Sequence, residues 1–193
     1  MQPAVFLDRD GTIIEDRGHL GDPKEVHFFP DTIPALRQLQ EHALLFVVTH
    51  QAGIAKGLVT DREVRLVNRH VTDHLARAGI SIREVYVCPH DRSEECRCIK
   101  PNPYHLHLAA QEYDIDLLRS FVLGDHPHDV ELARRAGATG IYLLTGHGRK
   151  HRDELPPGTL VADGIGEASR RVKQALTTGV PGVDSRPAAA EEA

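Results

Sequence analysis

The chain has 193 residues, of which 40% are hydrophobic, and it carries a formal net charge of -5. This length fits one domain with a sizeable core, while the negative charge and the lack of a basic run argue against a nucleic-acid partner. No apolar stretch approaches the roughly 20 residues that a membrane span needs. Because the chain opens with a core strand rather than a signal peptide, we expect a cytoplasmic protein without a membrane partner, and we expect a monomer.

The first predicted element is a buried strand over residues 4–7. Its apolar run is short and continuous rather than alternating, which is typical of the interior of a parallel sheet. Asp8 and Asp10 follow the strand directly, and Gly11 ends the run. In an open α/β sheet, ligands bind where the strands end. Two carboxylates this close repel each other unless a cation shares the site, and Mg²⁺ prefers oxygen ligands of this kind.

Helices and strands are expected to alternate along the rest of the chain. A polar hairpin or flap is expected at 15–24, and Asp31 is predicted to cap a helix that runs to about residue 42. Thr60 and Glu63 have the spacing of a capping box, and Gly79 ends the helix that they open. The other expected elements are strands at 44–49, 84–88, 121–124, 141–144 and 160–161, and helices at 103–113, 129–136 and 165–176.

This alternation predicts an α/β fold. We expect a doubly wound, Rossmann-like parallel sheet with helices on both faces and no large cap domain. The domain is expected to cover residues 1–178. The composition of residues 179–193 predicts a disordered tail.

Polar residues end several of the predicted strands. Thr49 ends the second strand, Lys100 ends the loop after the third, and Asp125 follows the fourth. Asp129 lies one helical turn beyond Asp125, where it can orient Lys100 or a metal-bound water. If the sheet is parallel, all of these residues lie at one edge. Such a set suits a phosphoryl group, because Thr49 can donate a hydrogen bond to one oxygen and Lys100 can neutralise another.

These strand ends together resemble the four motifs of the haloacid dehalogenase superfamily of phosphatases. The matching residues are Asp8-Arg9-Asp10-Gly11-Thr12, Thr49, Lys100-Pro101, and Gly124-Asp125 with Asp129. The resemblance implies that Asp8 is a nucleophile that forms an aspartyl-phosphate and that Asp10 is a general acid/base. It also implies a catalytic Mg²⁺, which we assign to Asp8, to Asp10 through its backbone carbonyl or side chain, and to Asp125.

A second cluster of residues lies in the loop 88–100. Cys88, His90, Cys96 and Cys98 offer three thiolates and one imidazole, a set of the type that Zn²⁺ takes in closed structural sites. An odd number of cysteines in an intracellular chain also suits metal binding better than disulfides. The loop leads directly into Lys100. We therefore expect a structural zinc ion that braces the loop and so positions Lys100.

The zinc loop narrows the resemblance to small capless phosphatases. Together with Thr49–Gly57, it is similar to enzymes that act on D-glycero-D-manno-heptose 1,7-bisphosphate or histidinol phosphate. We expect a small phosphorylated metabolite to contact His50, Gln51, Ile99 and His126. Three of these differ from those relatives: His50 replaces an Asn, Ile99 an Arg and His126 a Lys. Two cations are thereby lost, so we hypothesise a substrate less anionic than a heptose bisphosphate.

Other functions remain open from the residues alone. The chain can be a histidinol-phosphate phosphatase or a phosphotransferase with an acceptor other than water. A receiver-like signalling domain also uses strand-end acids, a Thr and a Lys around Mg²⁺, although Asp10 supplies an acid/base that such a domain does not need. A zinc-braced phosphate-binding protein without activity is a further alternative.

Overall fold

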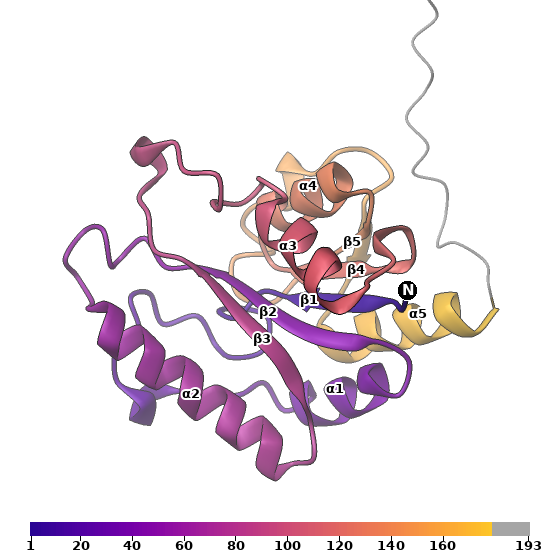
Figure 1. Ribbon diagram of the computed structural model, residues 1–193, viewed down its shortest axis with the longest axis horizontal. Helices are drawn as coiled ribbons and strands as arrows, with labels where there is room; N and C mark the ends of the chain where they lie inside the picture. The colour runs from indigo at the N-terminus through magenta and orange to yellow at the C-terminus, as the bar shows by residue number, and fades with distance from the viewer. Residues whose placement is uncertain (179–193) are drawn as a thin grey trace, which may run out of the picture.

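The computed structural model describes residues 1–178, and the predicted tail at 179–193 lies outside the described residues. Its six strands form one parallel sheet in the order β3-β2-β1-β4-β5-β6 (Figure 1). The strands are β1 (Ala4–Leu7), β2 (Leu44–His50), β3 (Ile82–Cys88), β4 (Phe121–Gly124), β5 (Thr139–Leu143) and β6 (Leu160–Ala162). The helices are α1 (Thr32–Gln40), α2 (Asp61–Arg77), α3 (Tyr104–Tyr113), α4 (Pro127–Ala136) and α5 (Ile165–Thr178). The predicted fold class is thus confirmed.

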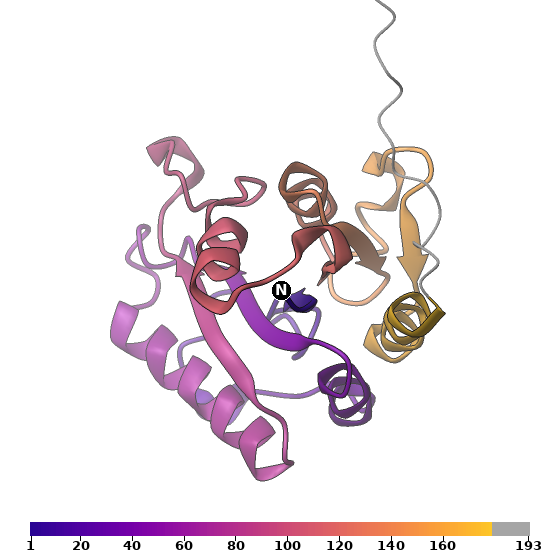
Figure 2. The same ribbon diagram turned by 45° about the vertical axis from the view of Figure 1, so that its right-hand side comes forward.

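Helices cover both faces of the sheet. Figures 1 and 2 show α1, α2 and α5 on one face and α3 and α4 on the other. Side chains alternate between the faces along each strand. In β1, Val5 and Leu7 pack in the core beneath α1, α2 and α5, whereas Ala4 and Phe6 pack in the core beneath α3 and α4. This double burial explains why the sequence of β1 is a continuous apolar run.

The strand order reverses at β1. From β1 the chain first adds β2 and β3 on one side, and then returns to place β4 on the other side. Leu7 pairs with Val47 of β2 and with Leu123 of β4, so β1 ends between two parallel strands from which the sheet extends to opposite sides. A crevice at such a reversal is the usual ligand site of an open α/β sheet.

Two local predictions are refined by the structure. Of the two forms expected for residues 15–24, a hairpin or a flap, the segment forms no hairpin of strands, and its regular element is a short 3₁₀-helix at Pro23–Glu25. It is instead a flap, because Asp16, Gly18 and His19 line the same cavity as Asp8 and Asp10. Asp31 precedes α1, but its side chain makes no capping hydrogen bond, because its backbone (φ -92°, ψ -2°) is helical rather than extended. Instead, Asp31 Oδ2 accepts a hydrogen bond of 2.9 Å from the backbone N–H of Gly166 in α5. Asp31 therefore joins α1 to α5.

None of the helices within residues 1–178 combines the length and the apolar character that crossing a bilayer requires.

A histidine lies in the core between α3 and β3. The ring of His105 is only 8% exposed and stacks on Tyr86 with 5.1 Å between ring centroids. Its Nδ1 has no hydrogen-bond partner among the described residues. Burial, assisted by the positive charge of Lys100, lowers the pKa of His105 to about 4. The folded protein therefore keeps this ring neutral.

This histidine predicts a loss of stability in mild acid. In the unfolded chain a histidine has a pKa near 6.5, so below that pH the unfolded state takes up a proton that the folded state refuses until about pH 4. We expect the free energy of unfolding to fall between these two pH values and His105→Leu to reduce that fall. Urea unfolding at several pH values measures it. His107→Leu, an exposed change on the same helix, is the control, and equal pH slopes in wild type and His105→Leu would contradict the prediction.

Candidate active site

A cavity of about 320 Å³ opens at the strand ends on both sides of β1. It contains eight of the expected catalytic and substrate-contacting residues, together with Asp129. These residues are Asp8, Asp10, Thr49, His50, Gln51, Lys100, Asp125 and His126. Ile99 differs: its side chain is 9% exposed and does not line the cavity. The structure thus brings the strand-end residues together, as their positions in the sequence predict, and leaves Ile99 in the protein interior.

Lys100 joins two of the carboxylates. Its Nζ lies 2.6 Å from Asp8 Oδ1 and 2.7 Å from Asp129 Oδ1, and all three side chains are largely buried. Burial by itself lowers the pKa of Lys100, but the charges of Asp129 and Asp8 more than offset it and raise that pKa. Lys100 is therefore a fixed positive charge beside Asp8.

Asp10 is held by a different set of partners. The guanidinium of Arg9, which is 1% exposed, donates to both carboxylate oxygens of Asp10 and, at 2.6 Å, to Asn68 in α2. Gln51 Nε2 lies 2.8 Å both from Asp10 Oδ2 and from Thr49 Oγ1. Burial raises the pKa of Asp10, and Arg9 opposes this in part. A carboxyl group with a raised pKa is suited to general acid catalysis.

Asp125 lies at the end of β4, against two glycines. Its Oδ2 accepts a hydrogen bond of 2.7 Å from the backbone N–H of His147. A Cβ atom on either Gly11 or Gly146 would collide with this carboxylate, and both glycines have a positive φ. Burial and the neighbouring charge of Asp8 raise the pKa of Asp125 to about 8. Carboxylates crowded in this way are the donors that a hard divalent cation takes.

Asp129 and His126 share a capping box at the start of α4. His126 is the N-cap residue, and Asp129, three residues later, accepts its backbone N–H at 3.2 Å. Asp129 also accepts a hydrogen bond from Lys100, and orienting Lys100 is one of the two roles expected for it. A Cβ atom on Gly124 would collide with Asp129, so the glycine that ends β4 makes room for this carboxylate.

Sequence reasoning did not single out three of these contacts. The first motif assigns no role to Arg9, although an arginine between two acids is a signal that it can pair with one of them. Gln51 lines the cavity, and its hydrogen bonds to Asp10 and Thr49 are contacts that its place in the sequence does not reveal. His147 contributes its backbone, which no side-chain pattern reveals.

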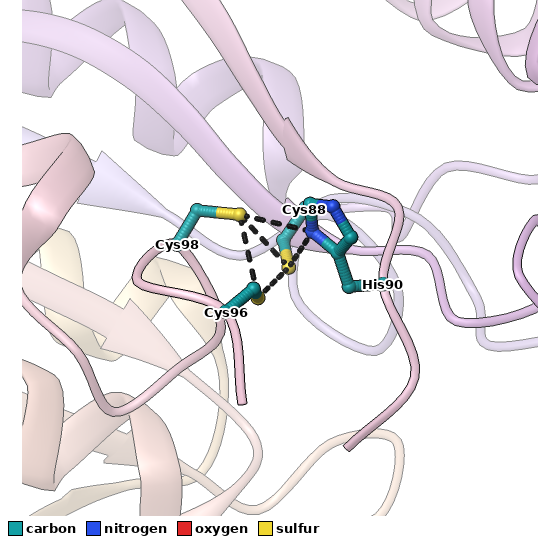
Figure 3. A group of neighbouring side chains, drawn as sticks. All are labelled: Cys88, His90, Cys96 and Cys98. Carbon is teal, nitrogen blue, oxygen red and sulfur yellow. Dashed lines mark hydrogen bonds between the residues drawn. The ribbon is translucent and has the colours of Figure 1, made fainter. Parts of the chain in front are cut away.

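The four expected zinc ligands converge on one point. The ligand atoms of Cys88, His90, Cys96 and Cys98 all lie within 4.8 Å of one another (Figure 3). The Sγ–Sγ distances are 3.3, 3.5 and 3.6 Å, and His90 Nδ1 lies 3.3 Å from Cys98 Sγ. A tetrahedron with Zn–S near 2.3 Å has S···S edges of about 3.8 Å. These residues can therefore bind a zinc ion.

Hydrogen bonds connect the residues of the zinc-ligand cluster to the end of β2 and the loop that follows it. Cys88 is the last residue of β3 and pairs in register with His50 of β2. The backbone N–H of Gln51 donates to the carbonyl of Cys88 at 2.8 Å, and His50 Nε2 lies 2.8 Å from the carbonyl oxygen of His90. His50 thus lines the cavity as expected while its Nε2 is bonded to the zinc loop.

The chain is similar to known phosphatases in sequence and in structure. A family model described as HAD-hydrolase-like matches residues 97–168. D-glycero-beta-D-manno-heptose-1,7-bisphosphate 7-phosphatase of Yersinia pestis is 35% identical over 75% of this chain and 81% of its own length. A probable heptose-bisphosphate phosphatase of Thermoplasma volcanium is 33% identical over 68% of this chain and 92% of its own.

A solved structure extends this similarity to three dimensions. The crystal structure of D,D-heptose 1,7-bisphosphate phosphatase from B. bronchiseptica, in complex with magnesium and phosphate, has a TM-score of 0.83 with this chain. The two are 29% identical, and the match covers 90% of this chain and 99% of the other. The expected resemblance is confirmed: the chain belongs to the haloacid dehalogenase (HAD)-like phosphatase family.

Proposed function

We propose that the protein is a Mg²⁺-dependent phosphomonoesterase that hydrolyses a small sugar bisphosphate through an aspartyl-phosphate on Asp8. The observation that carries the proposal is that two carboxylates one residue apart, those of Asp8 and Asp10, have different hydrogen-bond partners. Asp8 is held against Lys100, whereas Asp10 is held by Arg9 and Gln51. Two acids with separate partners are suited to two separate roles.

The donor set fits a magnesium ion. Asp8, Asp10 and Asp125 line one cavity, and Asp125 has no ion pair with a side-chain cation within residues 1–178. Burial, and then the charge of Asp8, raise the pKa of Asp125. These three residues would hold the ion, Asp10 through a carboxylate or backbone oxygen. When bound, Mg²⁺ would neutralise charge on the phosphoryl oxygens.

In the proposed reaction, Asp8 and Asp10 act in turn. A carboxylate oxygen of Asp8 attacks phosphorus, so that an Asp8–phosphorus bond forms and the bond to the sugar oxygen breaks. Asp10 gives its proton to that leaving oxygen. Asp10 then accepts a proton from a water molecule that attacks phosphorus, so that the bond between phosphorus and Asp8 breaks and inorganic phosphate is released. This second transfer restores both carboxyl groups.

Thr49 and Lys100 would position the phosphoryl group. Because Gln51 donates to Thr49 Oγ1, the hydroxyl proton of Thr49 is left to donate to a phosphoryl oxygen. Lys100 contributes a positive charge next to the attacking Asp8. Positioning and charge neutralisation of this kind supply most of the catalysis in phosphoryl transfer.

The size of the cavity and the named relatives together support the substrate class. A cavity of about 320 Å³ lies at the small end of small-molecule sites. The relatives from Yersinia pestis and Thermoplasma volcanium are named as phosphatases of a heptose bisphosphate. A receiver-like domain is less well supported, because it needs no second acid beside Asp8, whereas Asp10 is held there by Arg9 and Gln51 and has a pKa that burial raises, which suits general acid catalysis.

Replacing the nucleophile should abolish turnover. We expect wild-type protein to release many phosphates per chain from heptose 1,7-bisphosphate with Mg²⁺ and none with EDTA. Asp8→Asn should show no turnover, because an amide cannot attack phosphorus. Asp10→Asn should be slower by about 10²- to 10⁴-fold, since it lacks the transferable proton. Steady-state phosphate release measures all three proteins.

An exposed aspartate outside the cavity provides the control. Asp73→Asn, a half-exposed change on α2, should retain wild-type activity. Histidinol phosphate and simple sugar phosphates complete the panel. A wild-type protein that binds phosphate once without turnover would favour the receiver-like or binding alternatives, and turnover that survives Asp8→Asn would exclude the covalent route.

We further propose that zinc bound by the loop 88–100 is structural and supports catalysis through Lys100. The ligands Cys96 and Cys98 precede Lys100 by four and two residues. Asn102 Nδ2 also donates to the carbonyl of Cys96 at 3.1 Å, which ties the two ends of this segment together. Loss of the ion would free the segment that carries Lys100 to the cavity.

Removing one zinc ligand should therefore lower both stability and activity. We expect Cys96→Ser to contain no zinc, to unfold at a lower temperature and to turn over more slowly. Metal analysis, thermal unfolding and phosphate release measure these three effects. Ser93→Ala, in the same loop, should keep its zinc and its activity. A Cys96→Ser protein that lost zinc and kept full turnover would contradict the link to Lys100.

A further inference from the structure

The side chains around the cavity carry few free positive charges. Five aspartates line it, but only two of the lining residues are lysine or arginine, namely Lys100 and Arg92. Lys100 is already paired with two of the aspartates. Arg92 has no ion pair with any carboxylate among residues 1–178. Arg92 is therefore the cavity-lining guanidinium that remains available to an anion.

The protein partner of Arg92 is an imidazole. Arg92 NH2 lies 3.1 Å from Nδ1 of His128, and the same Nδ1 lies 2.8 Å from Nδ1 of His126. The rings of His126 and His128 are parallel, with centroids 4.5 Å apart. The backbone N–H of His128 also points at His126 Nδ1, at 3.3 Å. Two ring nitrogens, Nδ1 of His126 and Nδ1 of His128, thus take part in three contacts.

These contacts cannot all be hydrogen bonds at once. A ring nitrogen of a neutral imidazole either donates or accepts. If His128 Nδ1 donates to His126, it cannot accept from Arg92. If His126 Nδ1 donates instead, it cannot accept the backbone N–H of His128. An oxyanion near Arg92 would remove this conflict, because it accepts from the guanidinium and from an imidazole N–H.

Arg92 reaches the cavity from the zinc loop. It begins a short 3₁₀-helix, Arg92–Glu94, that lies between the zinc ligands His90 and Cys96. Asp91 caps this helix and lies 3.3 Å from Lys56 Nζ, which belongs to the loop after β2. The guanidinium is thus carried on a segment that is anchored on both sides and is separate from the residues that receive the reacting phosphoryl group.

We propose that Arg92, assisted by His128, binds a second phosphoryl group of the substrate, one that is not hydrolysed. The proposal rests on the proposed phosphatase function and assigns the bisphosphate specificity to this residue. Taken alone, Ile99 and His126, which replace cations of the relatives, favour a less anionic substrate. Arg92 supports the opposite expectation, because a guanidinium from a different segment restores one of the missing charges and can bind phosphate bidentately.

A pair of substrates tests the proposal. Kinetics are compared for heptose 1,7-bisphosphate and for heptose 7-phosphate, which lacks the second group. Arg92→Ala should raise KM for the bisphosphate about 10- to 100-fold with little change in kcat. It should leave KM for the monophosphate unchanged. Arg92→Lys, which keeps the charge and loses the bidentate geometry, should lie between Ala and wild type.

Controls separate recognition from folding. Arg97→Ala changes another exposed arginine of the same loop, one that stacks on Tyr104 at 4.3 Å and does not line the cavity. It should alter neither KM. Zinc content and thermal stability should match wild type in every variant. An equal effect of Arg92→Ala on both substrates, or no effect on either, would overturn the proposal.

Direct binding distinguishes this proposal from the proposed function. Affinity for the bisphosphate is measured by calorimetry for Asp8→Asn and for Asp8→Asn combined with Arg92→Ala. Weaker binding by the double variant, by about 10-fold or more, supports the second-phosphoryl site even if the wild type proves inactive. Equal binding overturns it even if the wild type is an active phosphatase.

Discussion

Repulsion among carboxylates at one edge of the sheet is the constraint on which the site depends. The reversal of strand order around β1 brings Asp8 and Asp125 together at the ends of neighbouring strands. Each carboxylate has its own partner. Lys100 forms an ion pair with Asp8, Arg9 forms one with Asp10, and a backbone N–H donates a hydrogen bond to Asp125. Because Asp8 and Asp10 each contact a side-chain cation and Asp125 contacts a backbone N–H instead, a metal cation would be needed most at Asp125.

The zinc loop connects the edge of the sheet to its centre. Cys88 extends β3, the edge strand, and bonds to the loop that follows β2. The same loop then delivers Lys100 to Asp8 beside the central strand. One segment with few apolar residues thus carries a charge to Asp8. A metal ion held by its four ligands would replace the hydrophobic packing that such a segment lacks.

The buried parts of the protein could be predicted from sequence, and several exposed contacts could not. Strand β4 was predicted at its exact bounds because a doubly buried strand is a continuous apolar run. Strand β3 begins two residues before its predicted start, because an edge strand tolerates exposed residues such as Arg83. The zinc ligands and strand-end acids lie in short sequence motifs. Arg92 meets His128 across 36 residues, and no local pattern reports that contact.

The pairing of β1 with β4 also has a consequence for synthesis of the chain. The backbone N–H of Ala4 is hydrogen-bonded to Ser120 Oγ, 116 residues further along the chain. Strand β1 therefore lacks its second neighbour until the ribosome has released the segment around residue 120. Closing so long a loop is slow compared with forming local helices. The acidic edge is completed only at this late stage, so a nascent chain that ends before β4 carries Asp8, Asp10 and Lys100 without Asp125 and Asp129.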